Sequence, residues 1–289
     1  MHSSRGNEHV SWARVTAVNS YLVTELIGAG LNRREARWLV EEYMPDGDRE
    51  AITALRQAAQ RRLNGEPLQY IFGHWPFRSL DLDVDPRVLI PRPESEELVG
   101  VALAELAASA TTAPVILDLG CGSGAIGLAL LHELNVRGVG ASVICVDESS
   151  DALVVAKRNA QKHELTAVSF VHSSWFDGLD LSLRGRIDLI VANPPYIGAE
   201  QFATLDPVLA YEPIGALVAP DASGVSGFSD IEEIVGGAAP WLVENGLLIC
   251  EHGDMHRIAA MDSARDAGFG EVRDRDDMFG NPRFLVARR

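Results

Sequence analysis

The segment with the clearest chemical potential is Asn193-Pro194-Pro195-Tyr196, which ends an apolar run. Each proline fixes its own φ, removes a backbone donor and keeps the preceding residue out of the helical region, so the segment forms a stiff, extended corner. The Asn193 side-chain oxygen and the Pro194 carbonyl are two fixed acceptors that can receive both hydrogens of one planar NH₂ group. Tyr196 adds a ring on which a planar group can stack.

Such a corner suits a difficult nucleophile. An amide nitrogen is nearly non-basic because its lone pair is delocalised, and two acceptors can polarise it and aim it at an electrophilic methyl group. Positioning of this kind can supply roughly 7–11 kcal/mol, and acceptors near the charge that develops on nitrogen add an electrostatic contribution. If that electrophile is the methyl group of a sulfonium cofactor, the pattern predicts methyl transfer, with Asn193, Pro194 and Tyr196 as catalytic residues. A plain proline-rich turn is the alternative.

A second segment, Asp118–Gly124, can bind the cofactor that such a reaction needs. Its sequence D-L-G-C-G-S-G joins an expected strand to an expected helix, where glycines let the backbone approach a ligand. Asp147 closes the next expected strand, and a carboxylate there can accept both hydroxyls of a ribose. The pattern predicts a nucleoside cofactor, either S-adenosylmethionine or NAD. The spacing G-x-G-x-G disfavours NAD, although Gly127 completes G-x-G-x-x-G from Gly122.

These two segments need a sheet to bring them together. From residue 114 onward, apolar strand-like runs alternate with helical stretches and glycine turns, which predicts an α/β fold with a mostly parallel sheet covered on both faces. The expected strands are residues 115–119, 143–146, 168–171, 187–191, 247–250 and 284–287. Asn193 then follows the fourth strand, at the edge where α/β proteins bind ligands.

Three regions are expected along the chain. Residues 1–65 predict a small helical bundle, in which Asn32 followed by Glu35 forms an N-cap pair. Residues 66–93 show partial alternation and predict a β-hairpin linker. Residues 94–289 form the catalytic domain.

Charge and composition narrow the class of partner. The net charge is −16, and residues 1–80 hold 10 basic and 9 acidic residues, so nearly all the negative charge lies in the remainder. This balance disfavours extended contact with a nucleic-acid backbone, and we expect no direct nucleic-acid binding. No apolar run reaches the roughly 18 residues of a membrane span, and the N-terminus shows no secretory h-region. Three cysteines without paired spacing favour a cytoplasmic protein.

Two further groups carry weaker signals. His252 and His256 lie four residues apart beside Glu251, but no third ligand has suitable spacing, and we expect no metal site. Cys121 lies in the glycine loop with no base evident in the sequence. We expect it to be a small loop residue rather than a nucleophile.

The chain resembles the release factor glutamine methyltransferases, class I enzymes that use S-adenosylmethionine to methylate the glutamine of the Gly-Gly-Gln motif in peptide chain release factors. The similarity extends from about residue 33 to the end. The stretches that carry it are G-E-P-L-Q-Y-I at 65–71, L-I-P-R-P-E at 89–94, the loop at 118–124, N-P-P-Y-I at 193–197, Y-E-P at 211–213 and E-H-G at 251–253. Amino-methylating DNA enzymes share N-P-P-Y, so the combination with I-P-R-P-E is the more specific signal.

The resemblance implies a Rossmann-like class I methyltransferase domain with a mostly parallel seven-stranded sheet, and a helical N-terminal domain that helps dock the release factor. It implies that the cofactor S-adenosylmethionine contacts Gly120, Cys121, Gly122, Ser123, Gly124, Asp147, Trp175 and Asn193, with Trp175 beside the adenine. It implies that the substrate glutamine is held by Asn193, Pro194, Pro195 and Tyr196. Residues 90–94 are expected to border the active site.

Ser174 departs from the family pattern, in which an acidic residue usually precedes the tryptophan aligned with Trp175. That acid is expected to reach the adenine amino group. A serine oxygen can accept the same bond without the charge, so we expect weaker cofactor binding.

Two other functions stay open. One is methylation of adenine N6 or cytosine N4 in a nucleic acid, because these groups present a similar NH₂. The acidic charge and the lack of an evident target-recognition domain disfavour it. The other is a non-catalytic scaffold that binds the cofactor, which the intact Asn193–Tyr196 corner disfavours.

Overall fold

The computed structural model describes residues 18–45, 49–109, 111–220 and 224–289. Residues 1–17 and 46–48 of the expected helical bundle therefore lie outside the described residues. The chain divides into two compact units, Met1–Gly73 and His74–Arg289. This division falls inside the segment that the sequence assigns to the linker.

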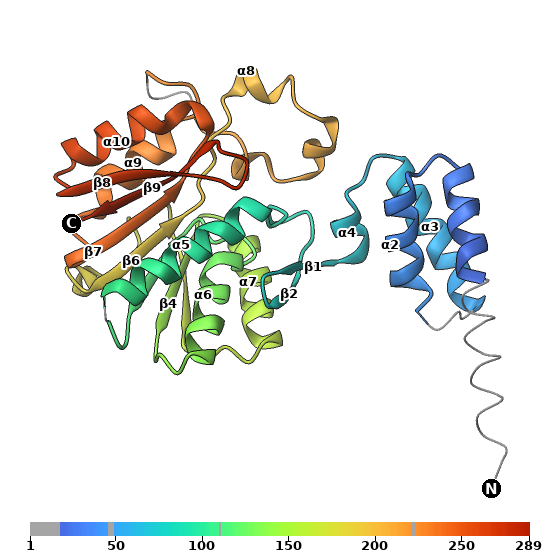
Figure 1. The fold of residues 1–289 in the computed structure, drawn as a ribbon, viewed down its shortest axis with the longest axis horizontal. Coiled ribbons are helices and arrows are strands. Elements are labelled where there is room, and N and C mark those ends of the chain that lie inside the picture. Colours follow the sequence, from blue (N-terminus) through green and yellow to red (C-terminus); the bar gives the residue numbers. More distant parts are fainter. Residues whose placement is uncertain (1–17, 46–48, 110, 221–223) are drawn as a thin grey trace, which may run out of the picture. The chain divides into compact units, whose positions relative to one another are not determined.

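The first unit is helical (Figure 1). Residues 18–28 form a helix, followed by α2 (Arg33–Tyr43), the 3₁₀ turn η1 (Arg49–Ala51), α3 (Ile52–Leu63) and α4 (Leu68–Phe72). The Asn32 side chain accepts the backbone N–H of Glu35 at 2.9 Å, so Asn32 is the N-cap of α2. The Glu35 carboxylate pairs with Arg62 of α3 at 2.9 Å instead of returning to the cap. Leucines such as Leu39 and Leu55 form a separate hydrophobic core.

A β-hairpin begins the second unit. Its strands β1 (His74–Phe77) and β2 (Leu80–Asp83) pair antiparallel. Phe77 and Leu82 are buried in the core of this unit. On the outside, Lys162 bridges Asp81 and Asp83, each at 2.8 Å. The hairpin is therefore anchored to the rest of the second unit by both packing and charge.

The second unit contains a seven-stranded sheet in the order β5-β4-β3-β6-β7-β9-β8 (Figure 1). Its strands are β3 (Val115–Leu119), β4 (Ser142–Asp147), β5 (Val168–His172), β6 (Ile187–Ala192), β7 (Leu242–Glu251), β8 (Glu271–Asp276) and β9 (Pro282–Arg288). The first five named here run parallel, and β9 is antiparallel to both β7 and β8. The predicted α/β fold with a mostly parallel sheet is confirmed. The strand β8, with the sequence E-V-R-D-R-D, was not among the expected strands because its charged residues hide the alternation.

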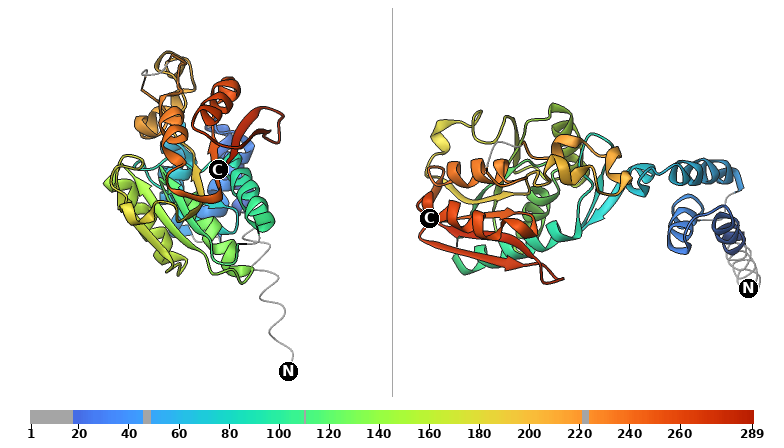
Figure 2. Two further views of the ribbon diagram at one scale, coloured as in Figure 1. Left: turned by 90° about the vertical axis from the view of Figure 1, so that its left-hand side faces the viewer. Right: turned by 90° about the horizontal axis from the view of Figure 1, so that it is seen from above.

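Helices cover both faces of the sheet (Figures 1 and 2). One core gathers residues of α5 (Pro93–Ser109), α6 (Ala125–Val136) and α7 (Ser150–Lys162), and the other gathers α9 (Ser229–Ala238) and α10 (Arg257–Asp266). Successive side chains of a strand point to opposite faces of the sheet. In β3, Ile116 accordingly packs in the first core and Leu117 in the second. Among the described residues, none of the helices has the length and apolar character needed to cross a bilayer.

Short elements fill the connections. They are η2 (Leu181–Leu183), α8 (Ala199–Phe202), η3 (Pro207–Tyr211), η4 (Ile214–Ala216) and η5 (Asp254–His256).

Strand β3 lies between β4 and β6, and Leu119 pairs with Val146 on one side and Ala192 on the other. The loops that leave these three strands therefore begin side by side, at the switch point where open α/β sheets bind ligands.

Candidate active site

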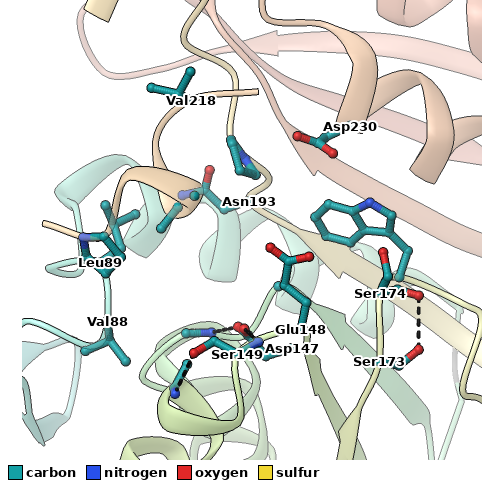
Figure 3. Close-up of a pocket in the computed structure, with 18 of the residues that line it drawn as sticks. Val88, Leu89, Asp147, Glu148, Ser149, Ser173, Ser174, Asn193, Val218 and Asp230 are labelled. Atoms are coloured by element: carbon teal, nitrogen blue, oxygen red, sulfur yellow. Dashed lines mark hydrogen bonds between the residues drawn. The ribbon is translucent and has the colours of Figure 1, made fainter. Parts of the chain in front are cut away.

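A cavity of about 450 Å³ lies at the carboxyl ends of β3, β4 and β6 (Figure 3). Gly120 and Gly122 follow β3, Asp147 ends β4, and Asn193 follows β6. The sheet thus brings together residues that are far apart in the sequence. Of the site residues discussed from the sequence, those that line the cavity are Gly120, Gly122, Asp147, Ser174, Trp175, Asn193 and Pro195.

The glycine loop leaves its backbone open to the cavity. Gly122 has a φ of 54°, and a Cβ built there would meet no atom within 4 Å. Gly120 has a φ of 68°, and its Cβ would lie 3.3 Å from the Trp175 ring. Trp175 itself has a φ of 36°, a strained backbone conformation of the kind that clusters at functional sites. Glycine at these two positions therefore allows the indole and the loop to form one wall.

Asp147 holds the glycine loop in place. One carboxylate oxygen accepts the Gly122 N–H at 2.8 Å, and the other accepts the Ser149 N–H at 2.9 Å. Burial raises the pKa of Asp147, and these two backbone bonds oppose the rise. Each oxygen keeps a further lone pair. The carboxylate can therefore anchor the loop and still accept two hydroxyls of a ribose.

The cavity wall is acidic. Its charged residues, among those that the structure describes, are Asp147, Glu148, Asp230, Glu233 and Arg87. The Arg87 guanidinium already pairs with Asp85 at 2.7 Å. Burial and the nearby Glu233 and Glu148 raise the pKa of Asp230 to about 6. Such a wall favours a cationic ligand and repels a pyrophosphate, so the site fits a sulfonium nucleoside better than NAD.

The Asn193 amide is held by side chains that do not line the cavity. Its Nδ2 donates to Ser95 Oγ at 2.9 Å, which leaves Oδ1 as the uncommitted acceptor of the side chain. Ser95, in the first turn of α5, is 4% exposed and donates to Glu251 Oε2 at 3.0 Å. Glu251 ends β7 and is fully buried. Side chains of α5 and β7 therefore fix the Asn193 amide, which Figure 3 shows in the cavity wall.

Tyr196 holds the Asn193–Tyr196 segment in place through contacts with Glu251 and Arg283. Its hydroxyl donates to Glu251 Oε1 at 3.3 Å, and the Arg283 guanidinium lies 5.8 Å from the ring centroid. Burial and the Glu251 charge raise the pKa of Tyr196, so the phenol keeps its proton. Tyr196 and the buried Pro194 do not line the cavity in this structure.

The remaining predicted loop residues, Cys121, Ser123 and Gly124, lie behind the cavity wall. Contact with Cys145 and burial raise the pKa of the Cys121 thiol, so it is no ready nucleophile. The Ser123 carbonyl accepts Asn159 Nδ2 at 2.9 Å. Gly124 is the N-cap residue of α6. These residues shape the loop from the protein side.

Glu212 connects two segments that border the site, although its residue type and position predicted no role for it. Its carboxylate is nearly buried and accepts the Ile90 N–H at 3.0 Å. It also pairs with Arg92 at 2.5 Å. The stretches L-I-P-R-P-E and Y-E-P are thus joined by one acid. In the sequence, the only signal for Glu212 and Glu251 was that they lie in the motifs Y-E-P and E-H-G, and Ser95 directly follows L-I-P-R-P-E.

The two histidines considered as metal ligands have structural partners. His252 Nε2 lies 2.5 Å from Asp274, and His252 is fully buried. His256 Nε2 lies 2.9 Å from the Ser226 carbonyl. Among the described residues, no group of three or more His, Cys, Asp or Glu side chains is arranged to hold a metal ion.

Comparison with known proteins identifies the family. A family model described as "Methyltransferase domain" matches residues 111–257. The chain is 40% identical over 270 residues to the release factor glutamine methyltransferase of Pseudomonas aeruginosa, covering 92% of each chain. It is 39% identical over 229 residues to that of Aliivibrio fischeri, covering 79% of this chain and 76% of the relative. This chain belongs to the release factor glutamine methyltransferase family. The resemblance drawn from the motifs is confirmed.

The fold comparison agrees with that placement. The crystal structure of the ribosomal protein L11 methylase from Lactobacillus delbrueckii subsp. bulgaricus matches with a TM-score of 0.50 and 16% identity. The match covers 73% of this chain and 95% of that chain. At this level of identity it supports the methyltransferase fold and nothing about the substrate.

Proposed function

We propose that this chain transfers a methyl group from S-adenosylmethionine to the side-chain amide nitrogen of the glutamine in the Gly-Gly-Gln motif of a peptide chain release factor. The observation that carries the proposal is the Asn193 amide, which lines the acidic cavity and whose Nδ2 is committed to Ser95, so that Oδ1 is the acceptor left for a substrate. Membership of the release factor glutamine methyltransferase family supports the choice of glutamine.

The cavity residues fit the cofactor. When bound, S-adenosylmethionine supplies an electrophilic methyl group on a sulfonium. Gly122 leaves open space for the ligand, and Asp147 keeps acceptors for its ribose. Trp175 supplies an aromatic wall for the adenine. Ser174 lines the same cavity as Asp230, so a carboxylate is present there although Ser174 carries none.

The corner residues orient the substrate. Asn193 Oδ1 accepts one hydrogen of the glutamine amide, and the carbonyl of Pro194, which does not itself line the cavity, accepts the other from between Asn193 and Pro195. The two bonds fix the plane of the glutamine amide and direct the face of its nitrogen toward the methyl group. Pro195 lines the cavity beside them. Tyr196 keeps the corner in place through its bond to Glu251. No base has to remove a proton before transfer. The bond from carbon to nitrogen would form as the bond from carbon to sulfur breaks and the neutral thioether S-adenosylhomocysteine leaves, and the methylated nitrogen would then give up one proton to water.

The wider setting belongs to the same proposal. The helical first unit helps to dock the release factor. The reaction takes place in the cytoplasm, where Cys121, Cys145 and Cys250 stay as the free thiols that the structure shows. A net charge of −16 supports a protein substrate over a nucleic acid.

The test uses purified protein, labelled S-adenosylmethionine, a release factor and its Gln→Ala variant. We expect label in the release factor and none in the variant. Equal labelling of both factors would sink the glutamine assignment. Label that enters only DNA or RNA would establish amino-group methylation of a base instead.

A further inference from the structure

A hydrogen-bond chain with a fixed direction lies behind the cavity. Asn193 Nδ2 donates to Ser95 Oγ, and Ser95 Oγ donates to Glu251 Oε2. Neither Ser95 nor Glu251 lines the cavity. Ser95 lies 98 positions from Asn193 and 156 positions from Glu251 in the sequence, so only the fold brings the three residues together.

The direction follows from the number of hydrogens. A carboxylate has no proton to donate, so the single hydroxyl hydrogen of Ser95 goes to Glu251. Ser95 can then only accept from Asn193. The Asn193 amide must turn its NH₂ group toward Ser95, and its oxygen is left for the cavity. A flipped amide would set the Asn193 oxygen against the Ser95 oxygen and leave a buried acceptor unsatisfied.

We propose that Glu251 acts through Ser95 as a positioning residue, which determines that the oxygen of Asn193, and not its NH₂ group, faces the substrate. This inference rests on the proposed function, because only an NH₂ substrate needs an acceptor there. It assigns a role to the E-H-G motif and to Ser95, which follows I-P-R-P-E. Ser95 and Glu251 then orient the catalytic amide without touching the substrate.

Glu251 lies among several charged and titratable groups. Arg283 of β9 lowers its pKa, Glu94 of α5 raises it, and Tyr196 donates to it from the loop after β6. Its strand neighbour Cys250 keeps its proton, because burial raises the pKa of that thiol. Burial dominates, and the pKa of Glu251 rises to about 7.

The protonation state of Glu251 therefore determines the direction of the hydrogen bonds and the orientation of the Asn193 amide. A protonated Glu251 can donate to Ser95, which frees the Ser95 hydrogen for Asn193 and lets the amide turn over. The ionised form enforces the productive orientation. Turnover should accordingly rise with pH through about 7, the pKa to which burial brings Glu251.

The test compares Glu251→Gln and Ser95→Ala with two controls. Glu244→Gln makes the same change at an exposed position of β7, and Ser95→Thr keeps the hydroxyl. We expect Glu251→Gln and Ser95→Ala to lower kcat about 10- to 100-fold, the size of one hydrogen bond to a charged group. The Kd of the cofactor should not change, and Glu244→Gln should keep the wild-type kcat. Ser95→Thr should restore part of the kcat that Ser95→Ala loses, because it keeps the hydroxyl. The inflection near pH 7 in kcat should disappear in Glu251→Gln.

A readout that needs no turnover separates this inference from the proposed function. In ¹⁵N-labelled protein, the Asn193 side-chain NH₂ resonance should shift with a midpoint near pH 7 and should not titrate in Glu251→Gln. A resonance that titrates equally in both proteins would overturn the inference. So would a wild-type kcat in Glu251→Gln when the wild-type enzyme methylates glutamine. If the wild-type enzyme methylates no glutamine while the resonance titrates as expected, the proposed function fails and the positioning role stands.

Discussion

Replacing Gly122 by alanine separates the cost to folding from the cost to cofactor binding. Gly122 has a φ of 54°, which costs a non-glycine residue about 1–2 kcal/mol. The lower entropy of the unfolded alanine chain offsets about 0.4–1 kcal/mol of this. A Cβ at Gly122 meets no protein atom within 4 Å, so no clash adds to the cost. The net loss of stability should be about 1 kcal/mol, which corresponds to a fall in Tm of about 2–4 °C.

The new methyl group would instead occupy the space that we assign to the cofactor. Gly122 lines the cavity, and its N–H is fixed by Asp147 at 2.8 Å, so the loop cannot swing away without losing that bond. We expect the Kd for S-adenosylmethionine to rise at least 10-fold, equivalent to about 1.4 kcal/mol. Isothermal titration calorimetry measures the Kd, and thermal unfolding without ligand measures the stability.

Gly138→Ala is the matched control. Gly138 has a φ of 74°, and a Cβ there also meets nothing within 4 Å. It follows the far end of α6 and does not line the cavity. It should lose the same stability and keep the wild-type Kd. If Gly122→Ala binds the cofactor as tightly as Gly138→Ala does, the cofactor does not lie against the glycine loop and the reasoning is refuted.

Three further predictions test other parts of the structure. Asn193→Ala should lower kcat at least 100-fold with an unchanged circular dichroism spectrum, whereas retention of most activity would remove the acceptor role. Glu212→Ala should lower the free energy of unfolding by about 2–3 kcal/mol, because it leaves the Ile90 N–H and Arg92 without their buried partner; a loss below about 0.5 kcal/mol in urea unfolding would contradict this. The free energy of unfolding should also fall as pH rises from about 5 to 8, because burial raises the pKa of Asp118 and of Glu251 to about 7 from ordinary values of 3.8 and 4.5. The folded protein then holds protons in this window that the unfolded chain has released, and urea unfolding that gives a rising or flat profile would show that these carboxyls are not protonated.

Local patterns were enough to predict the main frame of the site. The glycine loop, Asp147 and Asn193 each follow an apolar run, and the carboxyl ends of neighbouring parallel strands meet at one edge. The N-cap at Asn32 was predictable for the same reason, since its partner lies three residues away. Features set by adjacent residues can be read without knowledge of the tertiary structure.

Features that depend on tertiary contacts could not be predicted in this way. Ser95 and Glu251 meet across 156 positions, and no spacing rule relates them. The acidic wall requires α9 to bring Asp230 to the same cavity as Glu148. Strand β8 is held by backbone pairing with β9. Its side chains are mostly charged and show no apolar alternation, so the sequence pattern did not predict it as a strand.

The most direct test of the central claim is to locate the transferred methyl group by tandem mass spectrometry. A release factor is incubated with the enzyme and S-adenosylmethionine, and the peptide that contains Gly-Gly-Gln is fragmented. We expect one added methyl group on the side-chain nitrogen of that glutamine, absent from a reaction with Asn193→Ala. A methyl group on any other residue of the peptide, or equal methylation by the variant, would contradict it.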